Sequence, residues 1–406
     1  MHQEKPFFIN LIYAAAIWQT LPNFAPMQKP FYKDFKLGIL GGGQLGRMLV
    51  QPCVKYNILT HVLDEDANAP CKGVCTSFTQ GSFKDYQTVL DFAKNTDLIT
   101  IEIEHVNVDA LEELEKQGKP VYPQSHIIRM VQDKGLQKQF YKENNIPTSE
   151  FILLESEAEI ELHKDFLPAF QKSRTAGYDG RGVKGIFSEN DICDALKGPC
   201  LLEKKVDYEK EISIIIARNT QGEIAIYPAV EQVFHPEKNL LQYLQSPADI
   251  SSKVAEKANE IARHIMESLK MVGLLAVEMF VTKTSEVLVN EIAPRPHNSG
   301  HHTIEANLTS QYEQHLRAIT GMPLGATDAI QPSVLINLLG EEGYEGEAIY
   351  EGVEKCLGLP GVYIHLYGKT FTKPFRKMGH VTVVGKTWEE VKKKAEIVEK
   401  SLKIIA

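Results

Sequence analysis

The strongest fold signal in this chain is the stretch Leu37-Gly38-Ile39-Leu40-Gly41-Gly42-Gly43-Gln44-Leu45-Gly46. It has the pattern of a short buried strand, a glycine turn and the first turn of a helix. Its glycines match G-x-G-x-x-G, and Asp64 follows at the end of the next apolar run, where dinucleotide-binding proteins place an acidic residue. Backbone amides at a helix N-terminus favour a phosphate or similar anion. The stretch therefore predicts an anion-binding loop, with a tight turn that holds no ligand as the alternative.

Strand and helix patterns alternate beyond this loop. Apolar strands at 58–63 and 98–103 are separated by helical patterns, which is typical of a parallel, doubly wound sheet. From Lys134 onward the pattern of apolar residues changes, and it predicts longer strands and one amphipathic helix at 254–270. The last helix is predicted to begin at Thr387, because Thr-x-x-Glu390 matches a capping box.

Composition excludes several classes of protein. The formal charge of -9 argues against nucleic acid as the main partner. The six cysteines form no CxxC pair, so we expect reduced thiols and a cytoplasmic protein. The apolar run at 7–18 is too short to span a bilayer and lacks a clear cleavage site. We expect residues 1–35 to be a leader outside the fold, with Met27 as the true start, and we expect no membrane partner.

Two carboxylates stand in apolar strands, Glu278 within 274–281 and Glu291 within 287–292. A buried carboxylate is costly unless it is paired or bound to a metal. Neighbouring strands can turn both side chains to one face, whereas Asn290 would face away unless its strand twists or bulges. Carboxylate and amide oxygens suit Mg²⁺ held against phosphates. The pair therefore predicts a metal site, with a solvated acid pair or a salt bridge to Arg295 as the alternatives.

A second glycine loop, at 177–182, follows a strand that carries Lys172. Such a loop can close over triphosphate oxygens and exclude water, although an ordinary hairpin turn has the same pattern. The segment Glu203 to Val206 can present its backbone to an adenine edge, and Glu211 can accept from ribose hydroxyls. The alternative for these charges is plain solvation. Gly-Lys-Thr occurs twice, but the first glycine of a P-loop is missing each time.

The C-terminal part adds basic and histidine-rich segments. The stretch 293–302 follows the second acidic strand and can close the site on an anionic substrate. His301-His302 has no zinc-site spacing, so we expect a solvated or hydrogen-bonded role for this pair. Lys369, Arg376 and Lys377 are natural partners for phosphate or carboxylate, with a solvated hairpin as the alternative.

Together these stretches resemble the family of 5-(carboxyamino)imidazole ribonucleotide synthases. The resemblance runs from about Lys36 to the C-terminus and is carried by five blocks, at 41–48 (Gly-Gly-Gly-Gln-Leu-Gly-Arg-Met), 102–106 (Glu-Ile-Glu-His-Val), 176–182 (Ala-Gly-Tyr-Asp-Gly-Arg-Gly), 290–301 (Asn-Glu-Ile-Ala-Pro-Arg-Pro-His-Asn-Ser-Gly-His) and 376–380 (Arg-Lys-Met-Gly-His). The last two blocks are the most specific. Members of this family often carry a histidine near 232–241 that reaches the nucleotide; here the match falls on Phe234, with His235 one place on.

The resemblance implies an α/β (α+β) ATP-grasp enzyme. It would have a Rossmann-like domain at 36–133, an ATP-grasp domain at 134–330 with its lid at about 137–205, and a C-terminal substrate-binding region at 331–406. ATP, with two Mg²⁺ or Mn²⁺ ions, would phosphorylate bicarbonate to carboxyphosphate. The amine of 5-aminoimidazole ribonucleotide would take the carboxyl group, giving 5-carboxyaminoimidazole ribonucleotide, ADP and phosphate in purine biosynthesis. A homodimer is also implied.

The same resemblance assigns site residues. ATP would contact Lys134, Lys172, Gly177, Tyr178, Asp179, Gly180, Arg181, Gly182, Val183, Glu203, Lys204, Lys205, Val206, Glu211, Asn290 and Glu291. Metal would fall to Glu278 and Glu291. The ribonucleotide and bicarbonate would contact Glu104, Tyr178, Arg181, His297, Asn298, Lys369 and Arg376. Arg295 would orient bicarbonate, Lys369 would hold the carboxyphosphate or the ribonucleotide phosphate, and Asp179 would accept a proton.

Three other functions stay open at this point. One is a different ATP-grasp ligase, such as a formate-using glycinamide ribonucleotide transformylase, which the basic block at 369–380 disfavours. A non-catalytic nucleotide sensor is disfavoured by the intact acid pair. A dehydrogenase is disfavoured because no second motif fits hydride transfer.

Overall fold

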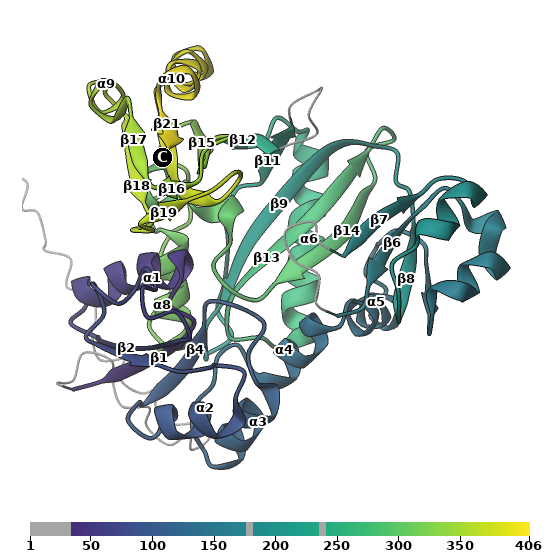
Figure 1. The fold of residues 1–406 in the computed structure, drawn as a ribbon, viewed down its shortest axis with the longest axis horizontal. Helices are drawn as coiled ribbons and strands as arrows, with labels where there is room; N and C mark the ends of the chain where they lie inside the picture. The colour runs from purple at the N-terminus through teal and green to yellow at the C-terminus, as the bar shows by residue number, and fades with distance from the viewer. Residues whose placement is uncertain (1–33, 176–181, 235–240) are drawn as a thin grey trace, which may run out of the picture.

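The N-terminal part is a parallel α/β domain, as the alternating pattern predicts. The computed structural model describes residues 34–175, 182–234 and 241–406. The first sheet has the strand order β3-β2-β1-β4, and its pairings are parallel. Its elements are β1 (Lys36–Leu40), α1 (Gln44–Lys55), β2 (Leu59–Asp64), β3 (Ser77–Gln80), α2 (Tyr86–Ala93), β4 (Leu98–Ile101) and α3 (Val108–Lys116). This domain lies at the lower left of Figure 1.

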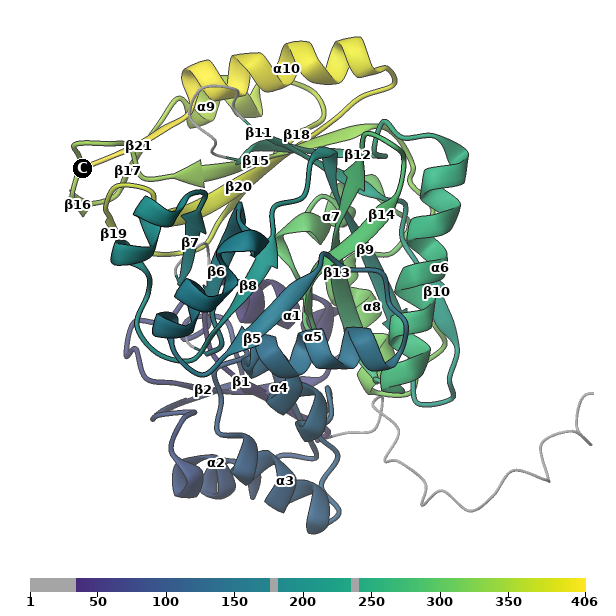
Figure 2. The same cartoon turned by 90° about the vertical axis from the view of Figure 1, so that its right-hand side faces the viewer.

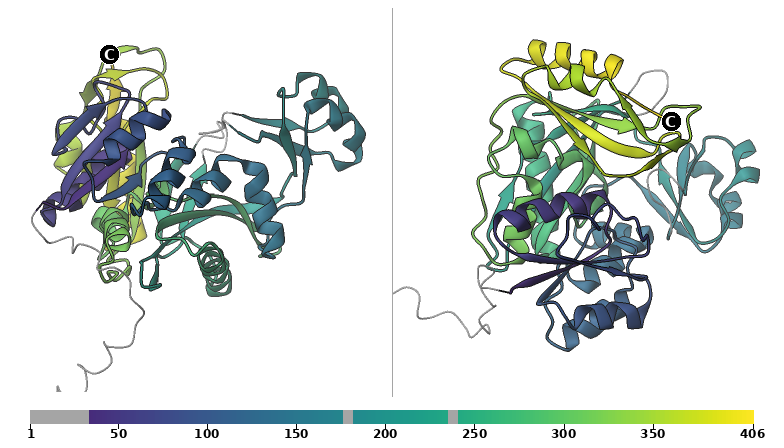
Figure 3. Two further views of the ribbon diagram at one scale, coloured as in Figure 1. Left: turned by 90° about the horizontal axis from the view of Figure 1, so that it is seen from below. Right: turned by 60° about the vertical axis from the view of Figure 1, so that its left-hand side comes forward.

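A small antiparallel sheet follows and forms the lid. Its strand order is β5-β8-β6-β7, and short 3-10 helices at 157–166 and 189–194 cover it. The elements are α4 (Ser125–Gln132), α5 (Lys134–Glu143), β5 (Phe151–Leu154), β6 (Ala169–Ser173), β7 (Val183–Ile186) and β8 (Cys200–Lys204). Seen from below, the lid stands apart from the N-terminal domain (Figure 3, left).

One nine-stranded sheet joins the middle and C-terminal parts. Its order is β14-β13-β9-β11-β12-β15-β20-β18, with β10 paired to β9, and its pairings are antiparallel. The strands are β9 (Tyr208–Arg218), β10 (Ile224–Ile226), β11 (Val230–Phe234), β12 (Leu241–Ser246), β13 (Gly273–Thr282), β14 (Val287–Ala293), β15 (Ser333–Leu339), β18 (Val362–Leu366) and β20 (Lys377–Val384). The β12–β15 pairing, with Leu244 opposite Leu335, makes the sheet continuous across the boundary predicted at 330. The sequence pattern does not predict this continuity.

Helices bury the outer faces of this sheet. The helix α6 (Ser252–Leu269) begins at Ser251, whose hydroxyl accepts from the amide of Val254, and its apolar face packs on β9 and β13. The helix α10 (Trp388–Ser401) covers β15 and β20, as Figure 2 shows. Thr387 caps α10 as predicted, but the carboxylate of Glu390 accepts from the amide of Lys386, so the capping box is only half formed. The remaining elements are α7 (Thr303–Ala306), α8 (Gln311–Ile319), β16 (Gly346–Glu347), β17 (Ile349–Glu351), α9 (Val353–Leu357), β19 (Phe371–Thr372) and β21 (Lys403–Ile405). No helix within the described ranges is long and apolar enough to cross a bilayer.

The junction between the N-terminal domain and the large sheet runs through one buried histidine. His315, on α8, is fully buried; its Nε2 lies 3.0 Å from the Thr100 hydroxyl of β4, and its Nδ1 accepts from the Leu274 amide of β13 at 3.2 Å. Burial lowers the pKa of His315 to about 3, so the ring stays neutral at ordinary pH. A neutral ring can serve both partners, one through each nitrogen.

This histidine should make the fold sensitive to acid. In the unfolded chain this histidine has its ordinary pKa of 6.5, whereas in the native protein its pKa is about 3. Between these two pH values the unfolded chain binds a proton that the native protein does not bind. The free energy of unfolding therefore falls as pH falls through this range. The loss is roughly 1.4 kcal/mol per pH unit. We expect His315→Gln to lose less stability than the wild type between pH 7 and pH 5, by about 2 kcal/mol. Urea unfolding at both pH values measures this, and His126→Gln, exposed on α4, is the control. If the His315 variant and the wild type lose the same free energy of unfolding between pH 7 and pH 5, His315 is not the source of the acid sensitivity.

Candidate active site

The two predicted carboxylates face each other across neighbouring strands. In the β13–β14 ladder Glu278 lies opposite Glu291, and the next pair is Met279 with Val289. Asn290 is therefore the extra residue of a β-bulge. The bulge turns Asn290 and Glu291 to the same half-buried face. In a strand without the bulge, Asn290 would face away from Glu291. The bulge therefore explains how neighbouring residues of one strand can face the same site.

The two carboxylates have opposite electrostatic environments. Burial and the negative charge of Glu291 raise the pKa of Glu278 to about 8. Burial would also raise the pKa of Glu291, but Lys134 and Lys172 outweigh it and lower that pKa to about 2. The Lys134 ammonium lies 2.7 Å from Glu291. Two facing acids of which one retains a proton form a pair that a divalent cation would stabilise.

A buried ionic cluster holds the lid against this sheet. Glu203 of β8 accepts from Lys138 of α5 at 2.6 Å and from Lys172 of β6 at 2.5 Å, and all three side chains are at least 85% buried. Burial would raise the pKa of Glu203, but the two lysines lower it to about 2. Lys172 also donates to the Asn290 amide oxygen at 3.0 Å. The lysine predicted to meet phosphate thus bridges the lid and the bulge of β14.

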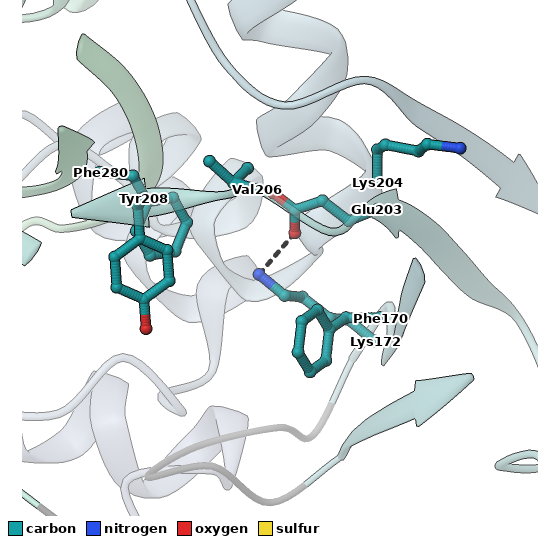
Figure 4. A pocket seen from close by; sticks show the side chains of 7 residues that line it. All are labelled: Phe170, Lys172, Glu203, Lys204, Val206, Tyr208 and Phe280. Carbon is teal, nitrogen blue, oxygen red and sulfur yellow. Dashed lines mark ion pairs between the residues drawn. The ribbon is translucent and has the colours of Figure 1, made fainter. Parts of the chain in front are cut away.

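An apolar pocket lies beside this cluster, where the lid meets the large sheet. Figure 4 shows its lining and the ion pair between Lys172 and Glu203. Tyr208 and Phe280 stack with ring centroids 4.7 Å apart, and Phe170 closes the pocket from the lid. The full lining is Phe170, Lys172, Glu203, Lys204, Val206, Tyr208 and Phe280. A flat aromatic ligand fits between such walls.

The other predicted residues near this pocket take different roles. Lys204 donates to the carbonyl of Phe166 at 2.9 Å, and Lys205 lies over the ring of Phe187. Burial raises the pKa of the Glu211 carboxyl, and a hydrogen bond from Tyr208 partly opposes that rise. In the β9–β13 ladder Glu211 lies opposite Phe280. Of these residues Glu211 is the one placed beside the stacked rings.

The segment after β14 brings a second set of polar groups to the acid pair. Arg295 pairs with Glu104 at 2.7 Å, which joins this segment to the loop after β4. The His297 Nε2 lies 3.7 Å from Glu278. Burial, and then the charge of Arg295, lowers the pKa of His297 to about 4, so its ring is neutral. The amide oxygen of Asn298 is buried and has no hydrogen-bond partner within the described residues.

The hydrogen bonds around His297 fix which nitrogen carries the proton. Its Nδ1 accepts from the Ser299 amide and lies 2.9 Å from the Ser299 hydroxyl, which in turn lies 2.8 Å from the hydroxyl of Ser213. Because an amide N–H can only donate, Nδ1 is the acceptor and the proton is on Nε2. The neutral ring therefore presents an N–H donor beside Glu278.

The C-terminal basic group is divided. Lys369 donates to the Gln44 side chain at 2.8 Å and to the carbonyl of Lys377 at 2.7 Å. The charge of Lys377 also contributes to the low pKa of His297. Arg376 instead donates to the carbonyl of Phe371 in its own hairpin. Lys369 and Lys377 are thus the members of this basic group that lie near the site. Lys369 also joins the C-terminal region to Gln44, the first residue of α1.

The first glycine loop is filled by the protein's own carboxylates. The Glu102 carboxylate accepts from the amides of Gly43 at 2.8 Å and Gly46 at 2.6 Å, and Asp64 accepts from the amide of Gly42 at 2.6 Å. The prediction that this loop binds a ligand anion is therefore wrong for these amides. The anion that they accept is a side chain, and Asp64 holds the turn instead of contacting a ribose.

Some predictions fall on residues that the structure does not describe. Gly177, Tyr178, Asp179, Gly180 and Arg181 lie outside the described residues, as does His235. Gly182 and Val183 are described: the carbonyl of Gly182 accepts from Ser173, and Val183 pairs with Lys172. His301 and His302 are buried, so the solvated alternative for them is wrong. His301 takes the hydrogen-bonded alternative, through Gln311 and Tyr312.

Sequence reasoning missed several residues of the site. Lys138 follows Lys134 by one helical turn, so the i, i+4 spacing carries a signal that both lysines share a face. Phe280 lies two residues after Glu278, and strand alternation places both on one face. Gln44 and Gln311 carry no such signal, because their partners are distant in sequence.

Three family models match successive parts of the chain. The ribonucleotide synthetase preATP-grasp domain matches residues 35–132, the ATP-grasp domain matches 139–312, and the phosphoribosylaminoimidazole carboxylase C-terminal domain matches 333–394.

Individual proteins match over most of the chain. Phosphoribosylaminoimidazole carboxylase, chloroplastic, of Vigna aconitifolia is 39% identical over 87% of this chain, which spans 65% of that protein's length. The crystal structure of N5-carboxyaminoimidazole ribonucleotide synthetase from Thermotoga maritima is 41% identical, with a TM-score of 0.84, and the match covers 92% of this chain and 99% of that one. The Aspergillus clavatus N5-carboxyaminoimidazole synthase in complex with ADP and 5-aminoimidazole ribonucleotide is 34% identical, with a TM-score of 0.82, over 90% and 98% of the two chains.

The carboxylate that fills the glycine loop should make Gly41 irreplaceable. Gly41 has φ +98°, and an added Cβ would lie 2.5 Å from Cγ of Glu102. We expect Gly41→Ala to lower the free energy of unfolding by about 2–4 kcal/mol, from backbone strain and overlap together. Gly118→Ala is the control: it has φ +81° but nothing within 4 Å, so strain alone should cost about 1 kcal/mol. Urea unfolding measures both, and equal losses would show that Glu102 does not constrain the loop.

Proposed function

The chain belongs to the ATP-grasp family of N5-carboxyaminoimidazole ribonucleotide synthases, and from this membership we propose that it carboxylates 5-aminoimidazole ribonucleotide. The substrates are ATP, bicarbonate and the ribonucleotide, and the products are 5-carboxyaminoimidazole ribonucleotide, ADP and phosphate. The A. clavatus relative, in complex with ADP and 5-aminoimidazole ribonucleotide, supports this choice of substrates. The observation on which the proposal depends is the position of His297 beside Glu278 of the Glu278–Glu291 pair, with Arg295 close enough to His297 to lower its pKa.

ATP binds between the lid and the large sheet in this proposal. The adenine enters the pocket between Phe170 and the stacked rings of Tyr208 and Phe280, against the backbone of Glu203 to Val206. Glu211 accepts from the ribose. Lys172 and Lys134 lie where the phosphates approach the acid pair, and they neutralise charge on the transferring phosphoryl group. The loop at 177–183 closes over the phosphates.

Magnesium, or manganese, fits the acid pair. No three His, Cys, Asp or Glu side chains within residues 34–175, 182–234 and 241–406 form a metal site by themselves. The protein therefore offers Glu278, Glu291 and the Asn290 amide, and phosphate oxygens and water must complete the coordination, as is usual for Mg²⁺. Burial and the charge of Glu291 raise the pKa of Glu278, and a divalent cation would oppose both effects. When bound, two such ions would neutralise the triphosphate and the developing charge.

Bicarbonate and the ribonucleotide bind beside His297 in this proposal. Arg295 orients bicarbonate, whose oxygen attacks the γ-phosphorus of ATP; ADP leaves and carboxyphosphate forms. The His297 Nε2 proton donates to an oxygen of the carboxyl group, and the Asn298 amide oxygen accepts from the hydroxyl of bicarbonate. The exocyclic amine of the ribonucleotide attacks the carboxyl carbon, phosphate leaves and the amine loses a proton, for which Asp179 is the proposed acceptor. Glu104, Tyr178, Arg181, Lys369 and Arg376 hold the ribonucleotide. Exclusion of water protects the acyl phosphate.

We also propose a homodimer in a reducing compartment, the cytoplasm. All six cysteines are free thiols, and four of them are buried. Size-exclusion chromatography with light scattering tests the dimer independently of activity.

The first test is the release of ADP. We expect ADP only when ATP, Mg²⁺, bicarbonate and 5-aminoimidazole ribonucleotide are all present, with carboxylated product in equal amount. Formate in place of bicarbonate should give none. ADP release that depends on formate would instead indicate a formate-using ligase.

The acid pair is tested by Glu291→Gln. Loss of the carboxylate removes a metal ligand and the partner of Lys134, so turnover should fall by at least about 10³-fold while Tm changes little. Glu286→Gln, exposed in the same hairpin, is the control and should retain full activity. Activity of the Glu291 variant near the wild-type level would refute the proposed role of the acid pair.

The C-terminal basic group is tested by Lys369→Met. Because Lys369 lies beside Gln44 at the proposed ribonucleotide site, we expect KM for the ribonucleotide to rise roughly 10-fold or more, with KM for ATP unchanged. Lys373→Met, exposed in the same hairpin, should change neither constant. A rise in KM for ATP alone would move Lys369 to the nucleotide site.

A further inference from the structure

The side chain of Gln311 holds the backbone of His297 from both sides. Its Oε1 accepts from the His297 amide at 2.9 Å, and its Nε2 donates to the His297 carbonyl at 2.7 Å. The backbone N–H can only donate and the carbonyl can only accept, so these partners fix the orientation of the side-chain amide. Gln311 is fully buried at the first turn of α8, fourteen residues further along the chain.

The surroundings leave this amide no other position. Nε2 also donates to Nδ1 of His301 at 3.0 Å, and the Tyr312 hydroxyl lies 2.9 Å from the same nitrogen. A Cβ added to Gly300 would lie 2.4 Å from Oε1 of Gln311, so the 297–300 segment packs directly on the amide. Burial lowers the pKa of His301 far below its usual range, so the ring is neutral, and because the Gln311 Nε2 can only donate, Nδ1 is the acceptor.

His297 is therefore fixed by two independent elements. Ser299 and, behind it, Ser213 of β9 orient its ring, whereas Gln311 of α8 fixes its peptide groups. The ring orientation alone does not set the distance from Nε2 to the reacting carboxyl group, because the backbone can still shift. The two hydrogen bonds between the Gln311 side chain and the His297 backbone remove that freedom.

We propose that Gln311 is a positioning residue for the carboxyl-transfer half of the reaction. It acts through His297 and Asn298 and contacts no substrate itself. The inference rests on the proposed function, since it assumes that His297 and Asn298 meet bicarbonate or carboxyphosphate. Misplacement of a reacting group by about 1 Å can lower a rate by roughly 100-fold, so a loosened His297 segment should slow catalysis without unfolding the protein.

The same helix provides a matched control. Gln314 is also fully buried, accepts from the Gly325 amide at 2.8 Å and donates to the Gly325 carbonyl at 2.7 Å. The two glutamines make the same pair of bonds to a peptide segment, but Gly325 lies in a segment that contributes none of the proposed site residues. Gln311→Met and Gln314→Met therefore both remove this pair of hydrogen bonds, and Gln311→Met also removes the bond to His301.

We expect both methionine variants to lower Tm, with the larger drop for Gln311→Met because it loses a third hydrogen bond, but only Gln311→Met to change the kinetics. Gln311→Met should lower kcat/KM for bicarbonate and for the ribonucleotide by roughly 10- to 100-fold, with KM for ATP within about twofold of the wild type. Gln314→Met should leave all three unchanged. Equal kinetics in the two variants would overturn the inference. A wild-type enzyme that releases no ADP with bicarbonate and ribonucleotide would instead refute the proposed function.

A second variant protects the test if Gln311→Met does not fold. Gln311→Glu keeps the acceptor for the His297 amide but places a carboxylate oxygen against the His297 carbonyl. Protonation restores a donor, and burial raises the pKa of such a carboxyl. We expect kcat/KM for bicarbonate in Gln311→Glu, relative to the wild type, to recover as pH falls from 8 to 6. A ratio that stays constant with pH would overturn the inference.

Discussion

Repulsion between two facing carboxylates governs the architecture of this site. Glu278 and Glu291 can share one face of the large sheet only because β14 bulges at Asn290 and because Lys134 stabilises one of the two charges. The lid cluster of Glu203, Lys138 and Lys172 is tied to the same bulge through the Asn290 amide. The proposed nucleotide and cation sites therefore share one short piece of backbone.

Three chain segments that are distant in sequence are tied together by the pairs Arg295–Glu104 and Lys369–Gln44. Glu104 comes from the N-terminal domain, Arg295 from the segment after β14, and Lys369 from the C-terminal region. The continuous sheet from β14 to β18 holds the last two in one frame, and α8 ties the first domain to it through His315.

Much of this was predictable from sequence, and the exceptions have physical reasons. Alternation of apolar residues gave the doubly wound domain and the two acidic strands, and the conflict at Asn290 already indicated a bulge. Local pattern does not report which distant groups satisfy a buried amide. The pairing of Gln311 with His297, the position of Gln44 beside Lys369 and the β12–β15 junction were therefore invisible. The glycine motif was misleading, because its amides are satisfied from inside the protein.

That internal satisfaction has a structural consequence. A loop that depends on a bound nucleotide for its shape softens whenever the nucleotide becomes scarce, whereas Glu102 is covalently part of the chain and never dissociates. The edge of the N-terminal domain that faces Lys369 is therefore held in shape by groups of the chain itself. At the proposed ribonucleotide site, this loop does not need a nucleotide to satisfy its amides.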